Sequence, residues 1–140
     1  MPWLQGYMLG TLQSSTIRIA VEASSSTLQR CLTEVELLQQ WIWPQQLQGS
    51  LPPKLEQGST FAAQWGPISI LHQVEILLPQ RLRLVMWGGA DGYCDWRWGN
   101  GWVQLRVEAV SLLPLGLGQL LMLRQLQQFA QSQERRPSGD

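Results

Sequence analysis

Charged side chains are scarce in this sequence of 140 residues. They make up 14% of the chain, whereas about 25% is usual for a soluble domain. Lys54 is the single lysine, the formal net charge is zero, and no basic stripe runs along any segment. The electrostatic signature of a nucleic-acid-binding protein is therefore missing, and we expect no nucleic-acid partner. Neutral glutamine side chains take the place of ions on the surface.

Residues that bind metals or act as nucleophiles are equally few. His72 is the single histidine, and Cys31 and Cys94 stand far apart without CxxC spacing. A metal site needs several clustered ligands, so we expect neither a metal nor a cofactor. No phosphate-binding glycine loop and no GxSxG motif occurs, and no catalytic residue is assigned. We expect two buried thiols in a reducing compartment, and the sequence leaves a disulfide open.

Long hydrophobic runs are also missing. The most apolar run, 112–123, is interrupted by proline, glycine and glutamine and is shorter than the roughly 20 residues of a membrane-spanning helix. No lysine or arginine precedes Arg18, so the basic start of a signal peptide is absent. We expect no integral membrane association and a cytoplasmic location.

Alternation of apolar and polar residues marks most of the chain. After an irregular N-terminal arm over 1–14, this alternation predicts a half-buried strand over 15–22 and a weak strand over 45–51. Further strands are predicted over 59–65, 68–77, 81–87, 93–98 and 102–110. The glycine-rich stretch 88–92 is predicted as a loop, and Asn100-Gly101 as a hairpin turn.

The charged residues of these strands all fall on one face. This consistency predicts an antiparallel meander with one wet face and one dry face. Glu75, Asp95 and Glu108 map to the wet face, so we expect these carboxylates in solvent rather than paired in a site.

Helical periodicity appears in three places. Two short helices are predicted over 25–32 and 34–41, and Trp41 and Trp43 at their exit are expected to staple helix to sheet. A long amphipathic helix is predicted over 115–132, followed by a disordered tail over 133–140. The sequence therefore predicts one α+β domain over 15–132, in which the last helix covers the dry face of the sheet.

This order of elements resembles the START-like superfamily, also called SRPBCC or Bet v 1-like proteins. The likeness begins at IRIAVEASSSTLQRCLTEVELLQQW, which is similar to the family's opening strand and paired helices. It continues at LPPKLEQGSTF, VEILLPQRLRLVMWG and WRWGNGWVQLRVEAVSLLP, and it covers about residues 15–131.

The resemblance implies a helix-grip fold, in which a curved antiparallel sheet wraps around a long C-terminal helix. In this superfamily the fold usually encloses a cavity between sheet and helix. Members bind lipids, sterols, polyketides, plant hormones or quinones, and others are cyclases, oxygenase subunits or chaperone cofactors. The resemblance thus implies a cavity, and it does not imply a reaction.

The candidate ligand-binding residues lie on the inferred dry face and on the last helix. A histidine there is costly unless its nitrogens find partners, so His72 is a candidate polar anchor, and burial should keep its ring neutral. Large side chains of this face and of the helix are candidates for holding a flat apolar ligand; they are Trp65, Met86, Trp96, Trp98, Met122 and Leu126.

Three functions remain open at this point. The first is a noncatalytic module that binds a small apolar or aromatic ligand. The second is a cyclase- or dehydratase-like enzyme with His72 as acid or base. The third is a protein-interaction domain with a filled core. Leu117, Leu120 and Leu121 lie off the main apolar face of the last helix, where they form a gate or partner patch, or are covered by Trp3, Tyr7 and Leu9 of the N-terminal arm. The sequence leaves the ligand and the oligomeric state open.

Overall fold

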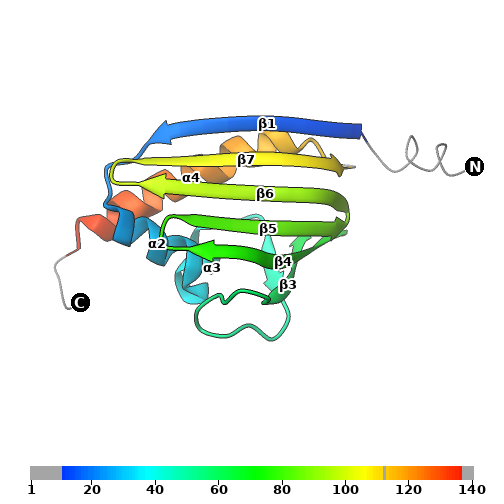
Figure 1. The fold of residues 1–140 in the computed structure, drawn as a ribbon, viewed down its shortest axis with the longest axis horizontal. Coiled ribbons are helices and arrows are strands. Elements are labelled where there is room, and N and C mark those ends of the chain that lie inside the picture. Colours follow the sequence, from blue (N-terminus) through cyan, green and yellow to red (C-terminus); the bar gives the residue numbers. More distant parts are fainter. Residues whose placement is uncertain (1–10, 112, 137–140) are drawn as a thin grey trace, which may run out of the picture.

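The computed structural model describes residues 11–111 and 113–136, which form a curved antiparallel sheet and three helices (Figure 1). The strands are β1 (Thr11–Ala20), β2 (Gln46–Gln48), β3 (Thr60–Trp65), β4 (Ile68–Leu78), β5 (Arg81–Gly88), β6 (Ala90–Gly99) and β7 (Trp102–Ser111). The helices are α2 (Ser25–Thr33), α3 (Val35–Trp41) and α4 (Leu115–Glu134). The order across the sheet is β1-β7-β6-β5-β4-β3-β2, so the predicted helix-grip architecture is confirmed.

The first strand begins earlier than the alternation predicts. Residues 11–14 pair with residues 108–111 of β7 and extend the strand toward the N-terminus. Leu12 is 70% exposed, so this extension rests on backbone pairing rather than on burial of side chains. The rest of the predicted N-terminal arm, residues 1–10, lies outside the described residues.

The glycine-rich stretch 88–92 was predicted as a loop, and this prediction is wrong. β5 ends at Gly88 and β6 already begins at Ala90, so Gly92 lies inside a strand. A Cβ atom on Gly92 would stand only 2.0 Å from the carbonyl oxygen of Glu108 on β7. The glycine therefore permits a close approach of two backbones, a role that composition alone does not distinguish from a turn.

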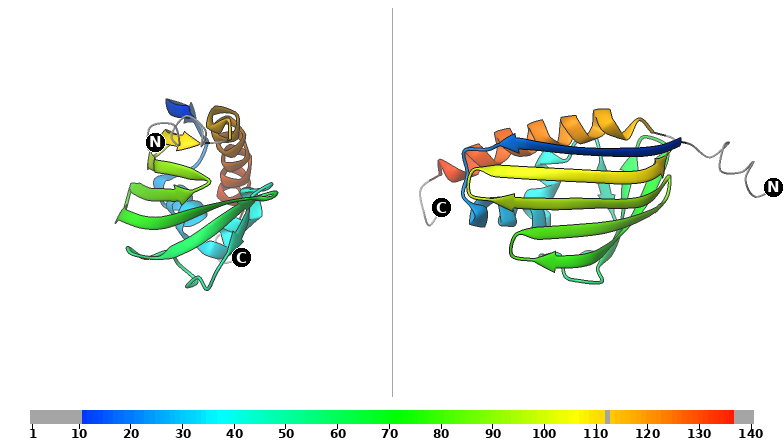
Figure 2. Two further views of the ribbon diagram at one scale, coloured as in Figure 1. Left: turned by 90° about the vertical axis from the view of Figure 1, so that its right-hand side faces the viewer. Right: turned by 45° about the horizontal axis from the view of Figure 1, so that its top comes forward.

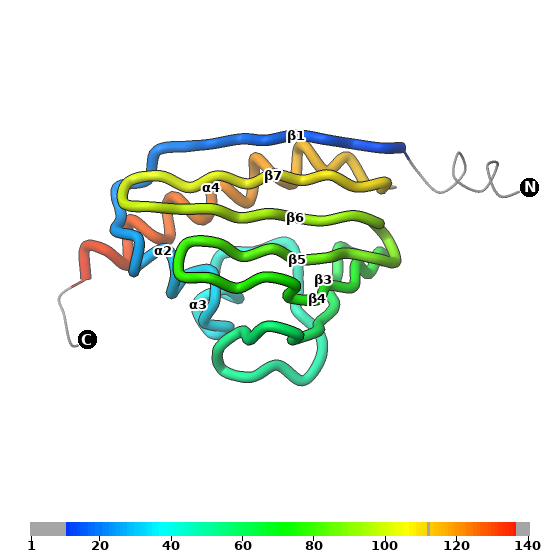
Figure 3. The backbone as a smooth tube through the Cα atoms, viewed as in Figure 1, coloured from blue at the N-terminus to red at the C-terminus, as the bar shows by residue number. Residues whose placement is uncertain are grey.

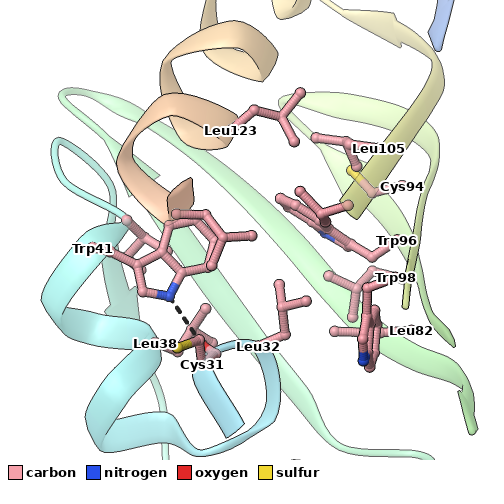
Figure 4. Packing of buried hydrophobic residues seen from close by; sticks show 14 of the residues in the cluster. Cys31, Leu32, Leu38, Trp41, Leu82, Cys94, Trp96, Trp98, Leu105 and Leu123 are labelled. Atoms are coloured by element: carbon pink, nitrogen blue, oxygen red, sulfur yellow. Dashed lines mark hydrogen bonds between the residues drawn. The ribbon is translucent and has the colours of Figure 1, made fainter. Parts of the chain in front are cut away.

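The two short helices lie next to each other toward one end of the sheet (Figure 3). Ser24 caps α2 by accepting a hydrogen bond from the backbone N–H of Thr27. The helix stops because the N–H of Val35, which a longer helix would direct to Cys31, donates to the carbonyl of Pro53 instead. The Trp41 indole N–H donates to the Cys31 carbonyl at 2.9 Å and satisfies it (Figure 4). Trp41 thereby ties α3 onto α2.

Helix α4 runs along one face of the sheet, which we call the inner face (Figure 2). Its buried residues recur at helical spacing: Gln119, Leu123, Leu126 and Ala130. Phe129 is only partly buried and packs against the core. No helix within the described residues is long and apolar enough to cross a bilayer.

The end of α4 is fastened to the start of α2. The carboxylate of Glu134 accepts hydrogen bonds from the Ser24 backbone N–H at 3.0 Å and from the Thr27 hydroxyl. This contact carries the helix two residues past its predicted end. Residues 137–140 of the predicted tail lie outside the described residues.

On the opposite, outer face, Asp95 departs from its predicted place in solvent. It is only 4% exposed, because Arg83 is its direct cross-strand neighbour and Arg81 and Arg97 flank it. Arg81 donates two hydrogen bonds to the carboxylate, at 2.9 and 3.2 Å. Burial by itself raises the pKa of Asp95, but the hydrogen bonds and charges of Arg81 and Arg97 outweigh it and hold that pKa below its usual value. Three long side chains thus bury a carboxylate that strand alternation assigns to water.

Candidate ligand cavity

A cavity of about 320 Å³ lies between the inner face of the sheet and the first turns of α4. Its volume falls at the lower end of the range for small-molecule sites. None of the residues that line it carries a formal charge at neutral pH; they are Gln45, Trp65, Ile70, His72, Met86, Cys94, Val107, Leu113, Pro114, Leu115, Leu117, Gly118, Gln119, Leu121 and Met122. The walls are therefore mostly apolar, with a few neutral polar groups.

A smaller cavity of about 60 Å³ adjoins the first. The two share Gln45, His72, Cys94 and Met122 in their walls. The smaller one extends toward α2 and α3, where Trp41 and Trp96 meet edge to face with ring centroids 6.0 Å apart. Figure 4 shows the two rings among the buried side chains around them.

The structure divides the seven predicted site residues. Four of them line the larger cavity: Trp65, His72, Met86 and Met122. Trp96 lines the smaller one. Trp98 and Leu126 line neither and are fully buried. Strand alternation correctly places Trp98 on the inner face, but it does not tell which stretch of that face is covered by packed side chains.

His72 projects from β4 into the wall shared by both cavities. Its Nδ1 lies 3.1 Å from the carbonyl oxygen of Ile70, and the Phe61 ring stacks on it with centroids 4.9 Å apart and planes 3° from parallel. Burial lowers the pKa of His72 to about 4, and the Ile70 hydrogen bond only partly counteracts this. The ring is therefore neutral at pH 7, as its predicted place on the dry face requires.

Gln119 is a site residue that the sequence reading missed. It is 1% exposed, and its Nε2 donates to the carbonyl oxygens of Leu105 at 2.7 Å and of Ser15 at 3.2 Å. Its Oε1 is buried without a hydrogen-bond partner among the described residues. The signal was present, because Gln119 is the one polar residue on the apolar stripe of the last helix.

Cys94 and Gln45 complete the polar part of the wall, and neither was predicted. The Cys94 thiol lies 3.4 Å from the sulfur of Met86, and burial raises its pKa to about 12. The thiol is therefore protonated and a poor nucleophile. The Gln45 amide Nε2 lies 3.0 Å from the sulfur of Met122. Cys31, the other cysteine, is likewise buried and free.

The rim of the larger cavity is formed by the start of α4. Leu117 is 72% exposed and Leu121 39%, and both line the cavity. Leu120, 47% exposed, points elsewhere. Gly118 faces Trp65, and a Cβ atom there would lie 3.2 Å from the indole ring. The absence of a side chain at Gly118 therefore leaves room for the indole. The covering arm that we considered for these leucines lies outside the described residues.

Metal chemistry finds no support in this arrangement. Within residues 11–111 and 113–136, no group of three or more His, Cys, Asp or Glu side chains could hold a metal ion. His72 has no carboxylate beside it in the cavity wall. What the site offers chemically is a partly open, mostly apolar volume with a few hydrogen-bonding groups.

This architecture defines the class of protein by its fold. The chain has the helix-grip fold that the START-like resemblance implies. No protein-family model matches the sequence, and no curated protein matches it by sequence. The likeness to known proteins is therefore one of structure.

Three solved structures similar to this chain have 16–21% sequence identity to it. The Aha1 dimer from Colwellia psychrerythraea matches with TM-score 0.65 and 16% identity, over 85% of this chain and 96% of that one. The AHSA1-like protein from Aeromonas hydrophila matches with TM-score 0.65 and 16% identity, over 91% and 100%. CalU16 from Micromonospora echinospora matches with TM-score 0.64 and 21% identity, over 89% and 80%. At such identities the comparison establishes the fold alone.

Proposed function

We propose that this domain binds a small, uncharged, apolar or aromatic molecule in the cavity between the sheet and the start of α4. The observation that carries the proposal is an uncharged cavity of about 320 Å³, which adjoins a smaller one of about 60 Å³, in a domain whose core is otherwise built from buried hydrophobic side chains. Interiors of this size normally contain few voids larger than a water molecule. A void that could hold roughly ten waters and opens beside an exposed rim is typical of a ligand site.

The two alternatives find less support. A protein-interaction domain with a filled core has no use for such a volume. An enzyme that uses His72 as acid or base at neutral pH needs a ring that titrates near pH 7, whereas burial lowers the pKa of this ring to about 4. The geometry favours His72 as a hydrogen-bonding anchor over His72 as a proton carrier.

The proposal is tested with a neutral fluorescent probe, N-phenyl-1-naphthylamine, titrated into the purified protein. We expect saturable binding at one site. Val107→Phe places a ring inside the cavity and should weaken binding by about tenfold or more, because it removes the volume that the probe occupies. Leu120→Phe adds the same kind of ring at an exposed position outside the cavity and should change binding less than about twofold.

Equal effects of the two substitutions would show that the probe binds elsewhere and would overturn the proposal. Native mass spectrometry of protein purified from its own host then addresses the natural ligand. The expected result is an added mass that disappears in Val107→Phe and persists in Leu120→Phe.

A further inference from the structure

The polar atoms left free in the cavity wall are not a random selection of donors and acceptors. Gln119 Oε1 is buried and has no partner among the described residues. Its orientation is fixed, because rotating the amide would press Oε1 against the carbonyl oxygens of Leu105 and Ser15, which Nε2 now serves. Less than 1 Å² of this oxygen is accessible, so it lies behind the cavity surface, and a ligand would reach it only if the side chains in front of it shifted. An unsatisfied buried acceptor of this kind calls for an explanation.

His72 presents an acceptor to the cavity itself. The partner of Nδ1 is a carbonyl oxygen, which can only accept, so Nδ1 carries the proton. In a neutral imidazole the other nitrogen is then an acceptor. Nε2 has no hydrogen-bond partner among the described residues, and His72 lines the cavity. The Phe61 ring stacked on the imidazole and the Ile70 contact together fix the ring plane.

The remainder of the wall excludes an ionised ligand. No lining residue is charged at neutral pH, and the lone pair of His72 Nε2 would repel a carboxylate or a phosphate. A buried charge without a partner is costly. Gln45 is the one further amide in the wall, and its Nε2 contacts the sulfur of Met122.

We propose that the cavity selects neutral ring compounds with hydroxyl groups, of which phenols are the simplest, and that the hydroxyl donates to His72 Nε2 or, once the side chains in front of it shift, to Gln119 Oε1. This inference rests on the proposed function and adds the chemical class of the ligand. Selectivity comes from the buried acceptors, because a ligand without a donor leaves them unpaired while it fills the same volume.

The inference is tested with three probes on one ring system: 2-naphthol, 2-methoxynaphthalene and 2-naphthoate. At pH 7 the naphthol is neutral and donates, the ether is neutral without a donor, and the naphthoate is an anion. Calorimetric titration of the unmodified protein should show 2-naphthol binding about 3- to 10-fold more tightly than the ether, the range for a hydrogen bond net of desolvation. The naphthoate should bind most weakly.

Variants assign the preference to the two acceptors. Gln119→Met and His72→Phe each remove one acceptor at similar volume, and the ratio of naphthol to ether affinity should fall toward one in at least one of them. Met86→Leu alters the same wall without touching an acceptor, so it should leave the ratio within about twofold. A ratio is used because general damage to the cavity affects both probes alike.

The outcomes separate this inference from the proposed function. If the ether binds as tightly as the naphthol, or the naphthoate binds best, the cavity is a binding site but the ligand class is wrong. If none of the three binds, the proposed function fails and the ligand class falls with it. A naphthol preference that survives both acceptor substitutions would also overturn the inference, because the selective donor contact would lie elsewhere.

Discussion

The N-terminal and C-terminal parts of helix α4 cover the same sheet with opposite results. The C-terminal part, from Leu123 onward, places Leu123, Leu126 and Ala130 in a core where each is 0% exposed, and α2 and α3 pack beside it. The N-terminal part begins with Leu-Gly-Leu-Gly, directs Leu117 outward, and borders the cavity. One helix thus has a filled end, where large side chains pack on the sheet, and a hollow end, where they do not. The difference lies in the side chains that the helix directs at the sheet and not in the strands beneath.

The filled end should be the stability centre of the domain. Leu126→Ala should lower the free energy of unfolding by about 2–5 kcal/mol, because it removes fully packed volume. Leu121→Ala, at the rim of the hollow end, should cost under about 1 kcal/mol. Urea titration at pH 7 measures both. Similar losses in the two variants would show that the helix does not divide as described.

The hollow end should dominate the response of stability to pH. The folded His72 has a pKa of about 4, against about 6.5 in an unfolded chain. Between these values the unfolded chain binds a proton that the folded chain does not, so the free energy of unfolding falls as pH drops from about 6.5 to about 4. The fall attributable to this ring is up to about 3 kcal/mol.

The variant His72→Gln should remove that part of the pH dependence. The quantity to measure is the difference in unfolding free energy between the two proteins from pH 7.5 to pH 4, since carboxylates common to both then cancel. A constant difference across this range would mean that the ring titrates normally in the folded protein. Met86→Leu serves as a control in the same wall and should retain the slope.

Two tryptophans of the packed core provide a finer comparison. Trp41 donates its indole N–H to the Cys31 carbonyl, whereas Trp98 Nε1 is buried without a partner among the described residues. Trp41→Phe should therefore lower the free energy of unfolding by about 1–2 kcal/mol more than Trp98→Phe does, because only Trp41→Phe leaves a buried carbonyl without a donor. Chemical denaturation of both variants measures the difference. The reverse order would show that Trp98 does more than fill space.

The smallest expected effect concerns fluorescence on ligand binding. Trp65 lines the larger cavity and Trp98 does not, so a bound aromatic probe should quench Trp65 more. Trp65→Phe should abolish most of the quenching induced by 2-naphthol, and Trp98→Phe should leave most of it. Quenching that disappears with Trp98→Phe would move the ligand into the end that we describe as filled.

Much of the fold can be predicted from the spacing of apolar residues and from the turn residues between the elements. The alternation in β4, β5 and β7, the Asn100-Gly101 hairpin and the long apolar stripe of α4 each identify one element locally. Errors arose where tertiary contacts override pattern. Gly92 permits a close approach of two backbones inside a strand. Backbone pairing with β7 extends β1 through residues 11–14, which do not depend on burial for this. Asp95 is buried because residues from two strands gather over it.

The sequence by itself determined which residues face inward, because alternation in a strand and spacing in a helix follow from local geometry. It therefore identified His72 and Trp65 as inner-face residues, and it predicted a neutral imidazole from burial alone. Only the tertiary structure decided which part of the inner face is covered. The position of α4 over the sheet, the glycines at its start and the packing of α2 and α3 are long-range outcomes. They separate Trp98, which fills the core, from Trp65, which lines a cavity. They also leave the side-chain oxygen of Gln119, close to that cavity, without a hydrogen-bond partner among the described residues.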